Sequence, residues 1–433
     1  MVKPITVKGA AMREGNARHV YCKTVEDEQR RERDARALHW RTTVVLGYNN
    51  IPFRVTADAF DPGPMLGDSD LCATSAHRLI LGGVKVIVWS PGIPFWNASR
   101  QALGGRAKVA FHQKQFAIMN GLGKHTDGLL QVARNAAEIR RINEAGGIAI
   151  LLHLSGVCHL NDMGILREYY DLGVRMIHCA FQDAAEDAGD RDMVQYGVVP
   201  HERVHYGGTL DEHGARTIEE MKKLGMIVDV AHLLPEGFDD VVSRLEGTPF
   251  VYSHGGCAAL YVNKRTFDDG RIAKVAENGG VYGIGVCLGP DLPEELSGDQ
   301  ENRRKLQRLS EDRVRRETAL NAQAQDVRDY IRLRIGEWNC WEERQLARLK
   351  AHVVKHSLIN VVAHMQHLRE TFGPEIVGYG PDYECTYQHV RGLEEADKTP
   401  NLTRALLEGG WPEADVQGAM GHNFMRVFDA VLR

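Results

Sequence analysis

Two histidines and one aspartate occupy the ends of apolar, strand-like runs in this sequence. His232 ends the run GMIVDVAH, His254 ends TPFVYSH, and Asp382 ends EIVGYGPD. In a barrel of parallel strands, the carboxyl ends of the strands form the rim at which ligands bind. Two neutral imidazoles and a carboxylate are suitable ligands for a catalytic divalent metal ion. These residues therefore predict a metal-dependent hydrolase.

The elements that would position these residues follow a repeated pattern. Short apolar runs of strand length alternate with amphipathic segments of helix length, and several of these segments end in glycine, as in YYDLG and MKKLG. Glycine there supplies the left-handed cap of a helix before the chain enters a strand. Eight runs predict an α/β fold of the TIM type, a (β/α)8 barrel. The runs are TTVVLGYNN, GVKVIVWS, GIAILLHLS, GVRMIHCAF, GMIVDVAH, TPFVYSH, GGVYGIGVC and EIVGYGPD.

Two regions lie outside the eight units, so we expect a barrel over residues 42–433 with two additions. Residues 1–41 form an N-terminal extension whose mixed charges indicate a solvated helix, with a partner-binding arm as the alternative. Residues 290–350 form a charged helical insertion between strands seven and eight. Insertions on that side of a barrel overhang the rim, so this one is either a lid or a subunit contact.

Composition and charge narrow the class of protein. The chain has 433 residues, 43% of them hydrophobic, which suffices for one large core. A net charge of −5 without any block of Lys and Arg argues against nucleic acid and favours a small-molecule substrate. No signal peptide or membrane span is recognisable, so we expect a cytoplasmic protein without membrane association. The eight cysteines show no CxxC spacing and indicate neither disulfides nor a zinc knuckle.

The motifs, taken in order, resemble those of the renal or membrane dipeptidase family of the amidohydrolase superfamily. The likeness covers residues 42–433 and is specific in GMIVDVAH, in the SH-containing segment that ends in NKR, in AENGGVYGI, around VGYGPD, and in the C-terminal NLTRALLEGGWPEADVQGAMGHNFMRVF. The resemblance implies a hydrolase with a binuclear zinc site at the barrel mouth, and commonly a homodimer. Carried over by position, His232, His254 and Asp382 match metal ligands, and Arg265 matches the arginine that binds a substrate carboxylate.

The sequence departs from the family pattern at several ligand positions. The family's first-strand His-Asn-Asp reads Tyr48-Asn49-Asn50, its bridging glutamate falls on Ser155, and a histidine after the fourth strand falls on Phe181. Two dications about 3.5 Å apart repel by roughly 19 kcal/mol at an effective dielectric of about 20, unless anionic ligands offset the repulsion. We therefore expect one divalent metal ion, zinc in the first place, with manganese or iron as alternatives.

A one-metal site can be assembled from three histidines. His153 precedes Ser155 by two residues, so both side chains point to the same face of a strand and the imidazole could replace the missing carboxylate. With His232 and His254 it would leave an open position for water. Asp382 would be the general base or a fourth ligand. Alternatively, these histidines bond only to loops, and His153 packs in the barrel interior.

The remaining site residues would bind the substrate and the transition state. His178 or Tyr48 would donate a hydrogen bond to the oxyanion, although Tyr48 would alternatively fill the vacated metal pocket. His159 is a further candidate near the fourth strand. Asn50 and Ser155 would orient the substrate. Arg265 would bind its carboxylate through two N–H groups, with a surface ion pair as the alternative.

Three functions follow from these expectations. The first is a metal-dependent hydrolase, dipeptidase-like, that cleaves an amide or related C–N bond of a small carboxylate-bearing molecule. The second keeps the metal but cleaves a C–C or C–X bond, or decarboxylates an aromatic acid. The third is a metal-free, non-enzymatic relic of the barrel. Metal content separates the third from the others, and a substrate panel separates the first two.

Overall fold

The structure is a computed structural model of the whole chain. His159 and nearly all of the predicted insertion at 290–350 lie outside the residues that it describes. The described residues are 14–50, 72–91, 105–155, 163–183, 194–197, 210, 212–233, 235–263, 265–286, 288–289, 308, 354–383 and 389–433.

Eight parallel strands form a nearly closed barrel, which confirms the predicted α/β fold. Each predicted run contains one strand, and neighbouring strands are hydrogen-bonded in the order in which they follow along the chain. Near the ends of the first and last strands, the amide of Asp382 donates to the carbonyl of Tyr48 at 3.0 Å. The strands are β1 (Val44–Asn50), β2 (Val84–Ser90), β4 (Ile148–Leu154), β5 (Val174–His178), β8 (Ile227–Asp229), β9 (Val251–Gly255), β10 (Val281–Ile284) and β12 (Val377–Tyr379).

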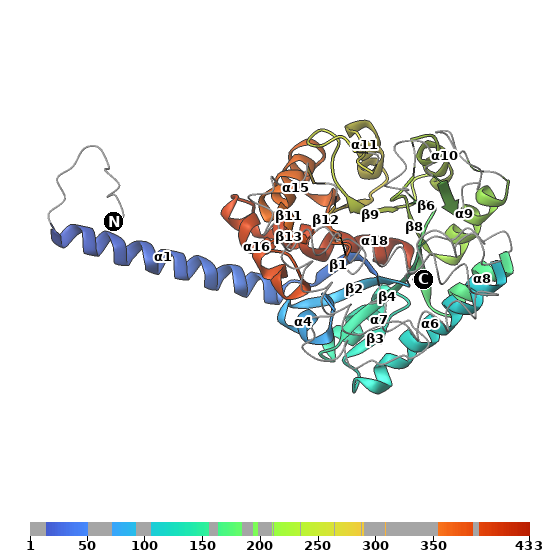
Figure 1. The fold of residues 1–433 in the computed structure, drawn as a ribbon, viewed down its shortest axis with the longest axis horizontal. Helices are drawn as coiled ribbons and strands as arrows, with labels where there is room; N and C mark the ends of the chain where they lie inside the picture. The colour runs from blue at the N-terminus through green and yellow to red at the C-terminus, as the bar shows by residue number, and fades with distance from the viewer. Residues whose placement is uncertain are drawn as a thin grey trace.

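Helices surround the barrel, as Figure 1 shows, and the described residues also include short accessory strands, one paired with β4 and the others in two separate two-stranded sheets. The helices are α1 (Glu14–Arg41), α4 (Ala76–Leu81), α6 (Gly105–His125), α7 (Ala136–Glu144), α8 (Met163–Asp171), α9 (Glu212–Leu224), α10 (Pro235–Leu245), α11 (Asp269–Glu277), α15 (Leu358–Phe372), α16 (Thr399–Glu408), α17 (Glu413–Gln417) and α18 (Asn423–Val431), with a π-helical turn at Gly418–His422 and 3-10 turns at Pro374–Ile376 and Ala396–Lys398. The accessory strands are β3 (Leu130–Val132), β6 (Ala180–Asp183), β7 (Val194–Gly197), β11 (Val354–Ser357) and β13 (His389–Arg391).

Glycine at the helix-to-strand junctions has the conformation that the sequence predicts. Gly225 separates α9 from β8 with a φ of +69°, and an added Cβ would lie 2.8 Å from the carbonyl oxygen of Val431. A left-handed residue in such close contact must be glycine. This junction therefore fixes where β8 begins, and with it the position of the residues at the far end of that strand.

Alternation along the strands separates two parts of the core. On β4, Ile148, Ile150 and Leu152 pack outward against the helices. Ala149 and Leu151 belong instead to an interior cluster with side chains of the other strands and of the C-terminal helix α18. His153 continues this inner face one step beyond Leu151. The lower interior is therefore apolar, and polar groups begin at the level of His153.

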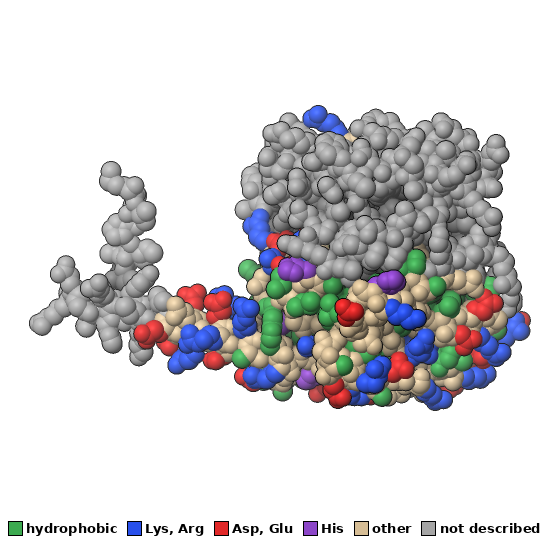
Figure 2. Space-filling model, turned by 90° about the horizontal axis from the view of Figure 1, so that it is seen from below, with side chains coloured by type: hydrophobic (Ala, Val, Ile, Leu, Met, Phe, Trp, Pro, Cys, Tyr) green, Lys and Arg blue, Asp and Glu red, His purple; other side chains and the backbone are tan. Residues whose placement is uncertain are grey.

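Helix α1 extends away from the barrel, as Figure 1 shows, and its C-terminal half packs on α16 and α17. His39 is fully buried there, with Nδ1 2.7 Å from Oγ1 of Thr403 and Nε2 2.7 Å from the carbonyl oxygen of Gly82. Figure 2 shows basic and acidic side chains interspersed along the described part of this helix and across the visible face of the barrel. Among the described helices, none is both long enough and apolar enough to cross a membrane.

Candidate metal centre

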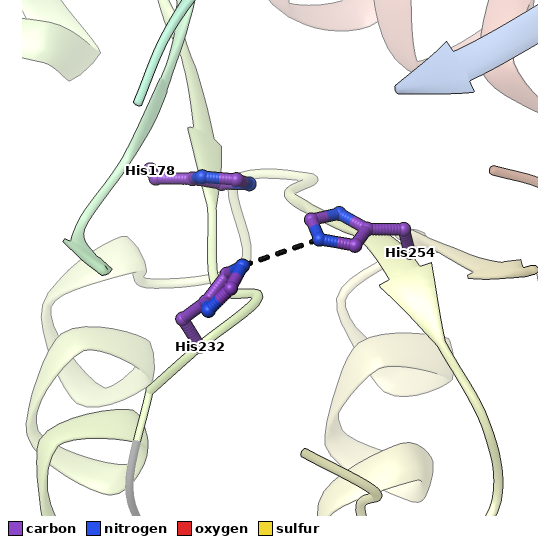
Figure 3. Close-up of side chains that lie close together, drawn as sticks. All are labelled: His178, His232 and His254. Atoms are coloured by element: carbon purple, nitrogen blue, oxygen red, sulfur yellow. Dashed lines mark hydrogen bonds between the residues drawn. The ribbon is translucent and has the colours of Figure 1, made fainter. Parts of the chain in front are cut away.

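Three histidines from neighbouring strands converge at the barrel mouth, and their side chains point toward one another in Figure 3. His178 ends β5, His232 follows β8, and His254 lies near the end of β9. One ring nitrogen from each lies within 4.8 Å of the other two, and Nε2 of His232 is 3.2 Å from Nε2 of His254. All three side chains are buried.

Backbone geometry at the strand ends directs two of the predicted residues. His232 has a φ of +68° and Asp382 a φ of +57°, both in the left-handed region that non-glycine residues seldom adopt. Such residues cluster at functional sites, where the surrounding structure compensates for the strain. The left-handed turn after β8 and the one after β12 therefore mark the mouth as a functional site.

The three imidazoles fit a divalent metal ion of the zinc type. Two nitrogens bonded to one tetrahedral zinc lie about 3.4 Å apart, close to the separation between His232 and His254. A ligand imidazole must be neutral. Burial lowers the pKa of His254 well below its usual value, and the positive charge of Arg265 lowers it further. His254 is therefore ready to bind a cation without first losing a proton.

Asp382 and Arg265 lie beside the three histidines, as the sequence predicted. Oδ2 of Asp382 is 3.8 Å from Nε2 of His254, and Nη2 of Arg265 is 3.2 Å from Nε2 of His232. Burial raises the pKa of Asp382 to about 7, and the guanidinium of Arg265 opposes this shift. A carboxyl group with a pKa near neutrality is suited to exchanging protons. The mouth thus combines Asp382, a group that can exchange protons, with Arg265, whose positive charge can bind an anionic ligand.

Tyr48 is surrounded by imidazole rings. Its ring stacks on that of His254 with centroids 4.2 Å apart and planes 11° apart, and it also contacts the rings of His153 and His178. The hydroxyl group donates to Oδ1 of Asn50 at 3.3 Å. Tyr48 is 2% exposed, so its phenol ring fills space inside the mouth. Asn50 therefore lies at the same rim as the histidines.

His153 does not join His232 and His254 in the grouping that the sequence predicted. Strand register places His153 opposite Met176, so that His178 lies one inward-facing step nearer the rim. His178 accordingly takes the place beside His232 and His254 that the prediction gave to His153. Oγ of Ser155 lies 3.2 Å from Nδ1 of His178.

His153 belongs instead to a second group, with His178 and Asp229. Its Nε2 is 3.2 Å from Oδ2 of Asp229, and burial lowers its pKa to about 4. Phe181, where the family histidine was expected, lies on β6, but its side chain is outside the described residues.

Asp229 is the residue that the sequence reasoning missed. It ends β8, is fully buried, and lies opposite His178 in the strand register. Burial alone would raise its pKa, but the adjacent imidazoles of His178 and His153 hold the pKa well below its usual range. A signal was present in the sequence, because a carboxylate inside the apolar run GMIVDVAH must find partners within the core.

The chain is similar to known dipeptidases over most of its length. The chain is 23% identical over 371 residues to "Dipeptidase verJ" of Clonostachys rogersoniana, covering 83% of this chain and 76% of that protein. It is 24% identical over 368 residues to "Dipeptidase 3" of Rattus norvegicus, covering 83% of this chain and 58% of that protein.

Two solved structures share the fold. The probable dipeptidase PvdM from Pseudomonas aeruginosa superposes with a TM-score of 0.68 at 19% identity, over 93% of this chain and 99% of that one. A metallo peptidase from Rhodobacter sphaeroides, liganded with a phosphinate mimic of the dipeptide L-Ala-D-Ala, gives 0.65 at 17% identity, over 90% and 99%.

The family model described as membrane dipeptidase (peptidase family M19) matches residues 32–433. This match extends through the barrel and includes the converging histidines, Asp382 and Arg265. The protein therefore belongs to the membrane dipeptidase family, peptidase family M19, and is a hydrolase of the metallopeptidase kind.

Proposed function

We propose that this enzyme cleaves the amide bond of a small, carboxylate-bearing, dipeptide-like molecule. The observation that carries the proposal is the convergence of His178, His232 and His254 beside Asp382 and Arg265 at one mouth. Membership of a hydrolase family argues against the metal-free relic. The structure of the Rhodobacter sphaeroides peptidase with a dipeptide mimic supports a substrate of this size, because the two chains share the fold.

We further propose that the site uses one metal ion, with zinc as the first candidate. Tyr48, Asn50 and Ser155 stand where the family resemblance implies ligands, and none of them offers a carboxylate. The Tyr48 ring, stacked on His254, occupies part of the mouth that a second ion would need. We therefore propose a divergent member of the family in which several of the metal ligands that the resemblance implies are replaced.

The chemistry divides among the residues of the mouth. His178, His232 and His254 would hold the metal ion, which when bound activates water and polarises the scissile carbonyl group. Asp382 accepts a proton from the attacking water and delivers it to the leaving amine nitrogen. Arg265 binds the substrate carboxylate through two N–H groups and so positions the amide bond.

The remaining polar groups would orient the substrate. Asn50 and Ser155 contribute a side-chain amide and a hydroxyl group at the rim. Tyr48, which donates to Asn50, holds that amide in place. The domain limits at 41 and 42, the homodimer and the cytoplasmic location stay predictions from the sequence.

Metal content and a substrate panel test the proposal. Protein purified without a polyhistidine tag and dialysed against metal-free buffer should contain about one zinc per chain by elemental analysis. It should hydrolyse dipeptides, lose activity on chelation, and regain it when zinc is added. Two ions per chain would contradict the one-metal proposal, and turnover only of aromatic acids would favour C–C or C–X cleavage.

A pair of histidine variants localises the metal ion. His232→Ala should lose bound metal and activity together, because it removes one of three nitrogen ligands. His367→Ala is the matched control, since this histidine lies on α15 and its Nε2 bonds to Oδ1 of Asp269 at 2.8 Å. Full metal content in His232→Ala would refute the ligand assignment.

A further inference from the structure

Two backbone amides and two imidazoles surround the carboxyl group of Asp229 inside the barrel. Its Oδ1 accepts hydrogen bonds from the backbone amides of Ala231 at 3.0 Å and Ser253 at 3.1 Å. Its Oδ2 lies 2.7 Å from Nε2 of His178 and 3.2 Å from Nε2 of His153. The two amides can only donate, and each ring nitrogen carries hydrogen in one tautomer of its imidazole. The geometry therefore suits the carboxylate.

This arrangement also fixes the hydrogen positions on two imidazoles. Because a carboxylate accepts and does not donate, we infer hydrogen on Nε2 of both His178 and His153; Nε2 of His178 also lies 3.2 Å from Oγ of Ser253, which can accept from it. The lone pair of each ring then lies on Nδ1. Rotation of either ring would break its bond to Asp229 in a fully buried environment, where an unpaired polar group costs about 1–3 kcal/mol. Both rings are thereby held in one orientation.

His178 connects this buried carboxylate to the metal centre. It belongs both to the group with His232 and His254 and to the group with Asp229 and His153. The three converging imidazoles carry no negative charge, and a dication in a buried site needs an anion close by. Oδ2 of Asp229 lies 2.7 Å from Nε2 of His178, whereas Oδ2 of Asp382 lies 3.8 Å from Nε2 of His254. Asp229 is therefore the nearer of these two carboxylates to the three imidazoles.

We propose that Asp229 is a positioning residue of the metal centre. It orients the His178 ring, fixes which nitrogen carries hydrogen, and supplies buried negative charge that favours the cation. This inference rests on the proposed function, since it requires that the histidines bind a metal ion. Carboxylates that hold metal-binding histidines in this way typically change metal affinity by about 10–100-fold when removed.

Metal affinity of an isosteric variant is the direct test. Asp229→Asn should bind zinc about 10–100-fold more weakly than the parent in competition with a chromophoric chelator. With cobalt in place of zinc, its visible absorption spectrum should change, because one ligand is no longer held in position. Asp269→Asn is the matched control, since it removes an exposed carboxylate that also bonds to a histidine, His367.

The outcomes separate this inference from the proposed function. If the parent protein binds no metal, the proposed function fails. If the parent binds metal and a folded Asp229→Asn binds it with equal affinity and an unchanged cobalt spectrum, only the role of Asp229 fails.

A measurement on the parent protein covers the case in which the variant does not fold. Long-range hydrogen–nitrogen correlation spectra of the metal-free, 15N-histidine-labelled protein report which ring nitrogen is protonated. We expect hydrogen on Nε2 of both His178 and His153. Hydrogen on Nδ1 of His178 would overturn the proposal.

Discussion

Single side chains at the mouth have roles that depend on what surrounds them. Tyr48 presents its ring to three imidazoles and only its hydroxyl group to Asn50. The contacts of the ring with three imidazoles favour a space-filling role over that of an oxyanion donor. If Tyr48 only fills space, loss of its hydroxyl group should change kcat little. If the hydroxyl group donates to the transition state, its loss should lower kcat strongly.

Removing only the hydroxyl group of Tyr48 distinguishes the two roles. Tyr48→Phe should keep kcat within about threefold of the parent, whereas loss of an oxyanion donor costs about 100–1,000-fold. Tyr48→Ala should lower the free energy of unfolding by about 3–5 kcal/mol, because it empties a buried aromatic position. Steady-state kinetics and urea unfolding measure both effects, and a hundredfold loss of kcat in Tyr48→Phe would contradict the space-filling role.

Asp382 is the residue at which acid–base chemistry and metal binding can be told apart. As the proton-transfer group it should be essential for turnover but not for holding the ion. We expect Asp382→Asn to lose about 100–10,000-fold in kcat and to retain the parent's zinc content. Loss of the zinc together with the activity would instead make Asp382 a fourth ligand.

At the scale of elements, strand ends were easier to predict than the register between strands. His232, His254 and Asp382 were recognisable because each ends an apolar run, and all three lie at the mouth. The choice between His153 and His178 depends on how far β5 is displaced along β4, a non-local property that neither run encodes alone. The role of Asp229 was not predicted for the same reason, since its partners come from other strands.

The loop after β9 shows how an element supports a binding residue. This loop carries Arg265, and Tyr282 on β10 holds it in place. The hydroxyl group of Tyr282 donates to the carbonyl of Gly256 at 2.7 Å and accepts from the amide of Phe267 at 3.3 Å. Its ring stacks on Tyr252, whose hydroxyl group bonds to the carbonyl of Arg265. The position of the guanidinium therefore depends on a tyrosine that does not reach the mouth.

Loosening this loop should weaken substrate binding more than catalysis. Tyr282→Phe removes both hydrogen bonds, so we expect KM for a dipeptide to rise several-fold with little change in kcat, and the free energy of unfolding to fall by about 1–2 kcal/mol. Arg265→Met is the reference, with a KM increase of about 10-fold or more for substrates with a free carboxylate. An unchanged KM in Tyr282→Phe would show that the loop keeps its position without Tyr282.

At the scale of the whole molecule, the N-terminal helix is coupled to the barrel through a buried histidine. Among the described residues, His39 joins α1 to α16 and to the end of α4, since it contacts Thr403 and the carbonyl of Gly82. Both ring nitrogens are satisfied when the imidazole is neutral, with hydrogen on Nε2. The family match begins at residue 32, so the C-terminal end of this helix lies within the matched region.

The protonation of His39 should make the stability of the protein depend on pH. Burial lowers the pKa of His39 from 6.5 to about 4, although the bond to Gly82 opposes the shift. Between these two values the unfolded chain binds the proton and the folded protein does not. The stabilising contribution is therefore complete above about pH 6.5 and declines as the pH falls toward 4, by about 3 kcal/mol in total.

A histidine variant isolates this contribution from those of the other buried histidines. In urea unfolding between pH 7 and pH 4, the parent should lose more stability than His39→Gln, with a difference in slope that corresponds to one proton. His77→Gln, at an exposed position on α4, is the matched control and should follow the parent. Parallel curves for the parent and His39→Gln would show that His39 is protonated alike in both states, and that α1 is not fixed to the barrel by a neutral imidazole.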